Sequence, residues 1–419
     1  MHLQSTLVAA ALTVCASAQN NWLGFNSGAT KADYSAKFKA DFEAEFRTAQ
    51  GLYHAPGKFN AVRLYTNIQA YSQDEPIQAF QAAIDTQTHV LLGVWASGTD
   101  NIDKELNALG KAVSALGTRF TDLVVGISIG SEDLYRNSKT GVKNKGGVGN
   151  SPENIVKFIR HFRQRFAKGP LAKVPVGHVD TWDAWTNSSN RAVIDNIDWL
   201  GVDEYPSYQS GENNNIGNAG RLFDEAFEKT VGVARGKPVW VTETGWPVSG
   251  PNWDQAVASV DNAKRYWNDV GCRRLFNKVP TFWYNLRDSN PDNKLKFAIT
   301  KDLSTKPLFE LSCPAKFEPK SRSANELSNH AANSTAVDSE PTATGSLSTT
   351  SMPTATSGSG SGSKSGSSGS GSGSGSAGNA ASPSASATPK DKTGAASAQK
   401  VSAAAAAAAA ILLGALALL

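Results

Sequence analysis

The sequence has few of the side chains that bind metals or join chains covalently. Its 419 residues include only three cysteines, six histidines and two methionines. No cysteine has a CxxC partner and the histidines show no HExxH spacing, so we expect no metal site and no other cofactor. The chain also carries little net charge. The formal net charge is +4, and no dense Lys/Arg stripe is interleaved with aromatic residues, which argues against nucleic-acid binding.

Only two of the three cysteines are expected in the mature chain. Cys15 lies in an apolar leader, whereas Cys272 and Cys313 lie in the mixed, aromatic-rich region. In an oxidising compartment, two remaining cysteines most simply form one disulfide. Two separate buried thiols are the alternative.

The N-terminal residues differ in composition from the middle of the chain. Residues 1–18 contain the apolar run "LVAAALTVCASA", whose small residues at the end are typical of a signal-peptide cleavage site. A buried N-terminal strand is the alternative. The sequons at Asn187 and Asn333 predict N-glycosylation of a secreted chain.

The C-terminal hundred residues also stand apart. Residues 320–393 are rich in Ser, Thr, Ala, Pro and Gly, which predicts a disordered, O-glycosylated linker, because such a segment buries too little apolar area to fold. Residues 394–419 end in "AILLGALALL", and this pattern predicts a GPI-attachment signal removed on maturation. Gly394 is the preferred attachment residue and Asn379 the alternative. A single-pass helix is disfavoured because no basic flank follows Leu419. We therefore expect a secreted protein held on the outer leaflet of the plasma membrane.

Residues 19–319 carry apolar runs that alternate with amphipathic segments. The eight runs are 21–26, 60–65, 89–95, 123–130, 174–181, 197–203, 238–243 and 279–285. Most are continuously apolar, as expected of strands buried on both faces. Helical patterns occupy 35–50, 101–116, 151–166, 224–234 and 254–267. This alternation predicts an α/β fold, a (β/α)8 TIM barrel. A doubly wound sheet is the alternative, but no G-x-G-x-x-G follows the first run.

Two of the apolar runs lead into a glutamate. Glu132 follows "VVGISIGS" and Glu243 ends "KPVWVTE". The carboxyl ends of the strands of a barrel gather at one mouth, so both side chains are expected in one cleft. A retaining glycosidase needs two such carboxyl groups, one protonated to release the leaving oxygen and one ionised to attack the anomeric carbon. A helix-starting glutamate and a buried structural ion pair are the alternative interpretation.

Other residues near the strand ends fit a sugar-binding cleft. Aromatic side chains stack on the apolar C–H faces of sugars. We expect substrate contacts from Arg63, Tyr65, Ser131, Trp182, Tyr205, Trp246 and Trp283, and core positions for Trp199, Trp240 and Trp267. Arg63 is a charge inside a strand, which is costly unless paired; beside a glutamate it would hold that glutamate ionised. A purely structural ion pair is the alternative. Tyr205 is expected to donate a hydrogen bond to a nucleophilic carboxylate.

Four stretches together resemble a known family. "VVGISIGSEDLYR", "LGVDEYPSY", "VTETGWP" and "VRLYTN" resemble glycoside hydrolase family 17, and more closely its fungal GPI-anchored endo-β-1,3-glucanases of the cell wall. The resemblance covers about residues 21–313. It implies a (β/α)8 barrel that cleaves β-1,3-glucan with retention during wall remodelling, with Glu132 as proton donor and Glu243 as nucleophile. One position departs from the pattern. Plant members have an asparagine before the acid/base glutamate, which contacts the sugar 2-hydroxyl, whereas this chain has Ser131.

The resemblance leaves two further functions open. Some fungal relatives transfer glucan chains instead of hydrolysing them, so a β-1,3-glucanosyltransferase using the same site is one alternative. A non-catalytic wall protein that binds glucan is the other, and the two intact glutamates argue against it. We expect a monomer whose partner is wall polysaccharide.

Overall fold

The computed structural model describes residues 21–317. The predicted signal peptide, linker and GPI signal, together with Asn333, Asn379 and Gly394, lie outside the described residues. Within residues 21–317, no helix has both the length and the apolar character needed to cross a bilayer.

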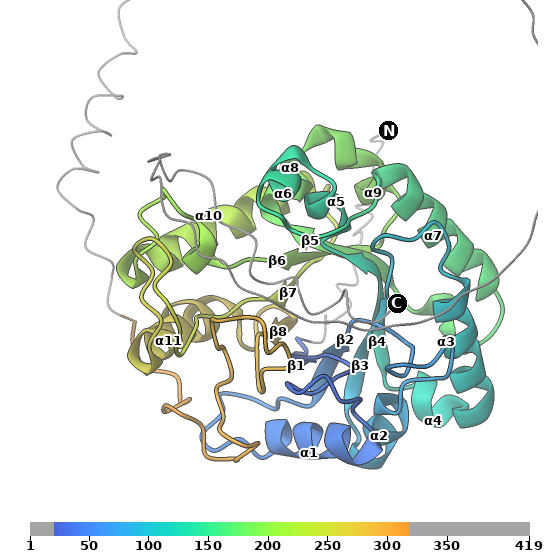
Figure 1. The fold of residues 1–419 in the computed structure, drawn as a ribbon, viewed down its shortest axis with the longest axis horizontal. Coiled ribbons are helices and arrows are strands. Elements are labelled where there is room, and N and C mark those ends of the chain that lie inside the picture. The colour runs from blue at the N-terminus through green and yellow to red at the C-terminus, as the bar shows by residue number, and fades with distance from the viewer. Residues whose placement is uncertain (1–20, 318–419) are drawn as a thin grey trace, which may run out of the picture. The chain divides into compact units, whose positions relative to one another are not determined.

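Eight parallel strands close into a barrel in chain order (Figure 1). They are β1 (Leu23–Ser27), β2 (Ala61–Leu64), β3 (His89–Val94), β4 (Val124–Ser131), β5 (Val176–Thr181), β6 (Trp199–Asp203), β7 (Val239–Glu243) and β8 (Thr281–Trp283). Each strand falls on one of the eight apolar runs, extending at most one residue beyond it. The predicted (β/α)8 barrel is therefore confirmed.

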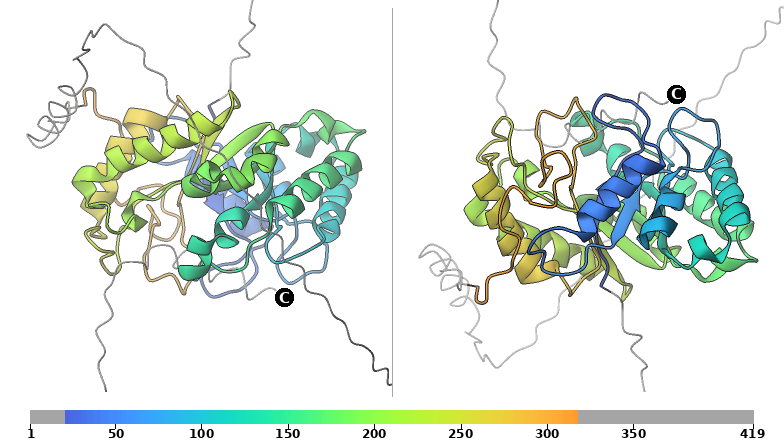
Figure 2. Two further views of the ribbon diagram at one scale, coloured as in Figure 1. Left: turned by 90° about the horizontal axis from the view of Figure 1, so that it is seen from above. Right: turned by 90° about the horizontal axis from the view of Figure 1, so that it is seen from below.

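Helices lie outside the strands, as Figure 1 shows from one side and Figure 2 from two others. They are α1 (Lys39–Gln50), α2 (Ala79–Thr86), α3 (Asp103–Leu116), α4 (Thr118–Thr121), α5 (Asp133–Arg136), α6 (Lys139–Lys143), α7 (Pro152–Arg165), α8 (Trp182–Thr186), α9 (Arg191–Asp195), α10 (Ile216–Val233) and α11 (Val260–Tyr266). A π-helical segment, Trp267–Leu275, continues α11.

The helix boundaries follow local capping. The expected start of α7 is confirmed, since Ser151 Oγ accepts a hydrogen bond from the Asn154 amide and proline occupies the first turn. Three other expected starts are wrong. Helix α1 begins at Lys39, four residues after position 35. Asn215 caps α10, which begins eight residues before position 224. Ser259 caps α11, which begins six residues after position 254 because Trp253 and Ala256 form an isolated β-bridge there.

The barrel separates two apolar regions. A small cluster inside it contains the stacked rings of Trp199 and Trp240, whose centroids lie 4.2 Å apart. A much larger layer packs between the strands and the helices and includes Trp267. All three tryptophans are core residues, as predicted. The disulfide between Cys272 and Cys313 is also present, and it ties the π-helical segment to the chain that follows the last strand.

Two irregularities in strand pairing lie where the predicted glutamates are. The register of β4 on β5 shifts between Ser128 and Ser131, immediately before Glu132. The register of β6 on β7 shifts at Asp203, which pairs with Glu243. Such bulges locally bend a strand and redirect its side chains, and they are over-represented beside active sites.

Candidate active site

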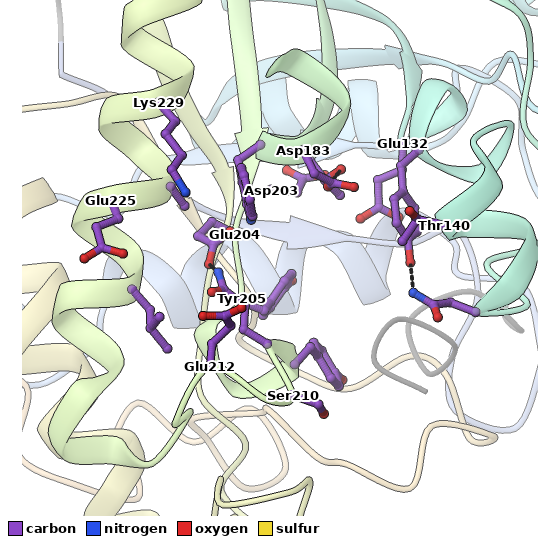
Figure 3. A pocket seen from close by; sticks show the side chains of 18 residues that line it. Glu132, Thr140, Asp183, Asp203, Glu204, Tyr205, Ser210, Glu212, Glu225 and Lys229 are labelled. Atoms are coloured by element: carbon purple, nitrogen blue, oxygen red, sulfur yellow. Dashed lines mark hydrogen bonds between the residues drawn. The ribbon is translucent and has the colours of Figure 1, made fainter. Parts of the chain in front are cut away.

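A pocket of about 450 Å³ opens where β4, β5 and β6 end. Figure 3 shows Glu132 and Thr140 on one side of it and Glu225 and Lys229 of α10 on the other. Tyr205, which follows β6, lies between the two sides. Glu243 is not among the residues that line this pocket, but it contacts Tyr205, which is. The two predicted glutamates therefore belong to one region at the carboxyl ends of the strands.

Glu243 is surrounded by hydrogen-bond donors. Arg63 Nη1 lies 2.6 Å from Glu243 Oε1, and the Tyr65 hydroxyl donates to the same oxygen at 2.7 Å. The Tyr205 hydroxyl donates to Oε2, also at 2.7 Å, as the sequence predicted. The residue as a whole is 3% exposed. A guanidinium and two hydroxyl donors around one carboxyl group complement a negative charge.

Arg63 is held in place by two further residues. Its Nη1 donates to Asn26 Oδ1 at 3.0 Å, and its Nη2 donates to Ser131 Oγ at 2.8 Å. Arg63 is 1% exposed and, like Glu243, is not among the residues that line the pocket; its hydrogen bond orients Glu243, and its predicted substrate contact stays a prediction. Ser131 accepts this hydrogen bond from Arg63, and its predicted sugar contact stays a prediction. Asn26 was missed because nothing in "GFNS" separates it from an ordinary strand-end asparagine.

Glu132 has a different environment. Its backbone is left-handed, with φ 57° and ψ 22°, and its amide donates to the Val179 carbonyl at 2.8 Å. Its only side-chain hydrogen bond in the described residues comes from Arg136 Nη2, 3.2 Å from Oε2. Burial raises the pKa of Glu132 to about 7; Arg136 opposes this rise and the charge of Glu243 adds to it. Glu132 can therefore both hold and release a proton near neutral pH, as a general acid and base must.

Two acidic residues at the end of β6 were not predicted as site residues. Asp203 is 2% exposed; its Oδ1 accepts from Thr242 Oγ1 at 2.7 Å, while Oδ2 has no partner within residues 21–317. Burial, reinforced by the charge of Glu243, raises the pKa of Asp203 well above its usual value. Glu204 accepts a hydrogen bond from Gln209 Nε2 at 2.6 Å. The motif "VDEYP" contained both residues, but only the fold shows that they line the pocket.

The structure separates the aromatic residues into pocket and core. Trp182 is half-buried, lines the pocket, and has Lys229 Nζ 4.5 Å from its ring centroid. The predicted sugar contacts of Trp246 and Trp283 are wrong, because both side chains are 2% exposed and pack in the layer under the helices. Trp246 Nε1 donates to the Val257 carbonyl. On β8, Phe282 faces into the barrel, so alternation directs Trp283 outward.

One other predicted site lies within the described residues. Asn187 is exposed in the loop after α8, and its glycosylation stays a prediction. In the part of the chain that the structure describes, no group of three or more His, Cys, Asp or Glu side chains is arranged to hold a metal ion.

Comparisons with known proteins identify the family of this chain. The chain is 50% identical over 315 residues to the probable glucan endo-1,3-beta-glucosidase eglC of Aspergillus oryzae, covering 75% of this chain and 67% of the relative. It is 27% identical over 275 residues to the glucan 1,3-beta-glucosidase of Schizosaccharomyces pombe, covering 65% and 79%. A solved glycoside hydrolase family 17 beta-1,3-glucanosyltransferase from Rhizomucor miehei shares the fold, with a TM-score of 0.55, 22% identity, and coverage of 70% and 98%. Residues 24–299 match the model of the BtgE/BtgC glycoside hydrolase domain, and the chain belongs to this family of glycoside hydrolases.

Proposed function

We propose that this glycoside hydrolase cleaves internal bonds of β-1,3-glucan with retention of configuration, by double displacement at Glu132 and Glu243. The observation that carries the proposal is the contrast between the two carboxyl groups. Glu243 accepts hydrogen bonds from an arginine and two tyrosines, whereas burial raises the pKa of Glu132 to about 7. The relative from Aspergillus oryzae, named a probable glucan endo-1,3-beta-glucosidase, supports the choice of substrate.

In the first step, Glu132 donates its proton to the glycosidic oxygen. The bond between that oxygen and the anomeric carbon breaks, while Glu243 attacks the same carbon from the opposite side and forms a covalent glycosyl-enzyme. Arg63, Tyr65 and Tyr205 hold the attacking carboxylate in one orientation before the reaction. Because these donors are fixed in advance, little reorganisation is needed when charge moves.

In the second step, Glu132 acts as a general base instead of a general acid. Its carboxylate takes a proton from a water molecule, whose oxygen attacks the anomeric carbon and displaces Glu243. Two inversions give net retention. One residue performs both steps well when its pKa is close to the working pH, and a value of about 7 meets that condition.

Transfer of the glucan chain is the second candidate reaction on the same site. It differs from hydrolysis only in that a sugar hydroxyl, not water, attacks the glycosyl-enzyme. The test is to incubate purified protein with linear β-1,3-gluco-oligosaccharides, to size the products, and to follow the anomeric protons by NMR. Hydrolysis predicts shorter products that first appear as the β-anomer. Longer products identify a transferase, and absence of turnover with retained binding identifies a glucan-binding protein.

The proposed location comes from the sequence alone. We propose secretion, a GPI anchor at Gly394 or Asn379, and a role in wall remodelling. Phospholipase should then release the protein from isolated membranes. Membrane fractions are needed because cross-linking to wall polysaccharide would also retain it on whole cells. Retention after phospholipase, combined with secretion of a chain truncated at Asn379, would instead favour a membrane-spanning helix.

A further inference from the structure

A buried histidine behind Glu132 takes no part in the mechanism above. His178, on β5, is completely buried, and both of its ring nitrogens face oxygen atoms. Nδ1 lies 2.5 Å from the Ile129 carbonyl oxygen, and Nε2 lies 3.0 Å from Asp180 Oδ2. A carbonyl oxygen accepts hydrogen bonds and never donates them, so Nδ1 carries a hydrogen.

The surroundings of Asp180 determine whether the other ring nitrogen, Nε2, carries a hydrogen. Asp180 Oδ2 accepts from the Leu134 amide at 2.8 Å. Its Oδ1 accepts from the amides of Tyr135 and Thr181 at 3.1 and 2.9 Å. Three amide donors stabilise an ionised carboxylate. An ionised Asp180 has no proton to offer, so His178 Nε2 must also carry a hydrogen, and the ring is an imidazolium.

Two negative charges face this ring. On β5 the neighbour is Asp180, and from the α5 turn the carboxylate of Asp133 adds a second negative charge. The other neighbours are uncharged. The ring of Trp185 of α8 lies nearly perpendicular to that of His178, and Leu200 of β6 pairs with His178 in register. Burial lowers the pKa of His178, but the hydrogen bond and charge of Asp180, joined by Asp133, raise it above its ordinary value.

The same groups hold the turn that carries Glu132. Asp180 fixes the amides of Leu134 and Tyr135 just after Glu132, and His178 fixes the Ile129 carbonyl just before it. Between these points the chain approaches the ring closely. A Cβ at Gly130, where φ is +85°, would lie 2.3 Å from Asp133 Oδ2 and 3.0 Å from His178 Cε1. A side chain at position 130 would therefore collide with Asp133 and crowd His178.

We propose that His178, as a buried imidazolium paired with Asp180, is a positioning residue that fixes the left-handed turn of Glu132 and so aims its carboxyl group at the glycosidic oxygen. This inference rests on the proposed function, because it assigns His178 a task only if Glu132 is the proton donor. A left-handed backbone at a residue other than glycine is strained and persists only where the surroundings impose it. His178 and Asp180 impose it from both ends of the turn.

The test compares His178→Gln with the wild type on two substrates. A linear β-1,3-glucan needs its leaving group protonated, whereas a dinitrophenyl β-glucan oligosaccharide does not. We expect kcat on the glucan to fall about 10- to 100-fold with KM nearly unchanged, because misplacing a catalytic group has effects of that size. The first-step rate on the dinitrophenyl substrate should stay close to wild type. Equal losses on both substrates would show a general structural role and overturn the proposal.

A double variant separates this proposal from the proposed function. In a Glu132→Ala background, His178→Gln should cause no further loss on the glucan, because the group that it positions is gone. A further loss would overturn the proposal. If Glu132→Ala itself slows both substrates equally, the assignment of Glu132 as proton donor fails first.

The imidazolium can also be observed without any variant. A ¹⁵N-edited NMR spectrum of the wild-type protein at pH 7 should show two protonated ring nitrogens for His178, and the signal should persist above the pH at which free histidine titrates. A single protonated nitrogen at pH 7 would overturn the inference even if His178→Gln did not fold. The NMR measurement does not depend on activity, so it tests the protonation state of His178 even if the role of Glu132 is reassigned.

Discussion

Arg63 and Glu243 form an ion pair across the mouth of the barrel, with Arg63 Nη1 2.6 Å from Glu243 Oε1 and side chains that are 1% and 4% exposed. The two residues come from β2 and β7, which are separated in the barrel by β1 and β8. Asn26 of β1 bridges the gap by accepting from the same guanidinium nitrogen. The pair therefore links strands that do not share a hydrogen-bonded edge.

Replacing Arg63 by methionine should cost both stability and activity. The change leaves Glu243 buried without its cation, and removing one partner of a buried pair typically costs about 3–5 kcal/mol. Turnover of β-1,3-glucan should fall with it, because the carboxylate loses a fixed donor. Urea unfolding gives the stability change.

Arg235→Met is the matched control for this change. Arg235 pairs with Asp195 at the surface, where the side chains are 53% and 41% exposed. Such pairs contribute about 0–1 kcal/mol. Equal stability losses in the two variants would contradict a special role for the buried pair.

The fold was predictable because its signal is local. Each buried strand is a short apolar run, and the segments between successive runs are long enough for a helix and often carry a helical pattern. The positions of Glu132 and Glu243 follow from the same pattern, since a carboxyl group directly after a buried parallel strand lies at one mouth of a closed barrel. Their roles remain a proposal.

The contacts between strands were not predictable in this way. Arg63 and Glu243 are 180 residues apart, and their pairing depends on barrel closure and register. The errors at Trp246 and Trp283 have the same origin. Whether a tryptophan near a strand end points to the pocket or to the helices depends on how inward and outward positions alternate there. His178 gave no signal at all, since a lone histidine in a strand is usually an ordinary core residue.

Removing the disulfide should destabilise the protein without changing its chemistry. Cys272 and Cys313 are 41 residues apart, and in the chain-entropy model closing such a loop stabilises the fold by about 4 kcal/mol. The double variant Cys272→Ser with Cys313→Ser should lose roughly that much in urea unfolding. Its kcat at 25 °C should be unchanged, because neither cysteine lines the pocket. Wild-type protein treated with reductant is the control and should match the variant. A loss well under 1 kcal/mol would refute the estimate.

The pH dependence should reveal the proton donor. Burial raises the pKa of Glu132 to about 7, so its protonated fraction falls as the pH rises through that value. The value of kcat/KM on β-1,3-glucan should therefore decline above about pH 7, while the first step on a dinitrophenyl substrate should not.

Glu105 provides the control for that titration. Burial also raises its pKa to about 7, but it lies on α3 and does not line the pocket. Both raised values make the folded state bind more protons than the unfolded state between about pH 4.5 and 7. Stability should consequently fall as the pH rises through this window. Glu105→Gln should make stability fall less steeply with pH and should leave the decline of kcat/KM above about pH 7 unchanged. A shift of that decline would assign it to Glu105 instead of Glu132.

The two glutamates can be told apart by chemical rescue. Glu132→Ala should lower glucan turnover by about 10²–10⁴-fold, the usual contribution of general acid–base catalysis. On a dinitrophenyl substrate its first step should survive and the glycosyl-enzyme should accumulate, because the second step has lost its base. Azide needs no base, so it should restore turnover and give a β-glycosyl azide. Glu243→Ala cannot form the glycosyl-enzyme, and its turnover should fall by several orders of magnitude. Azide should then attack from the face that Glu243 vacated and give the α-product. The opposite configurations, or near-normal activity in both variants, would overturn the assignment of the two residues.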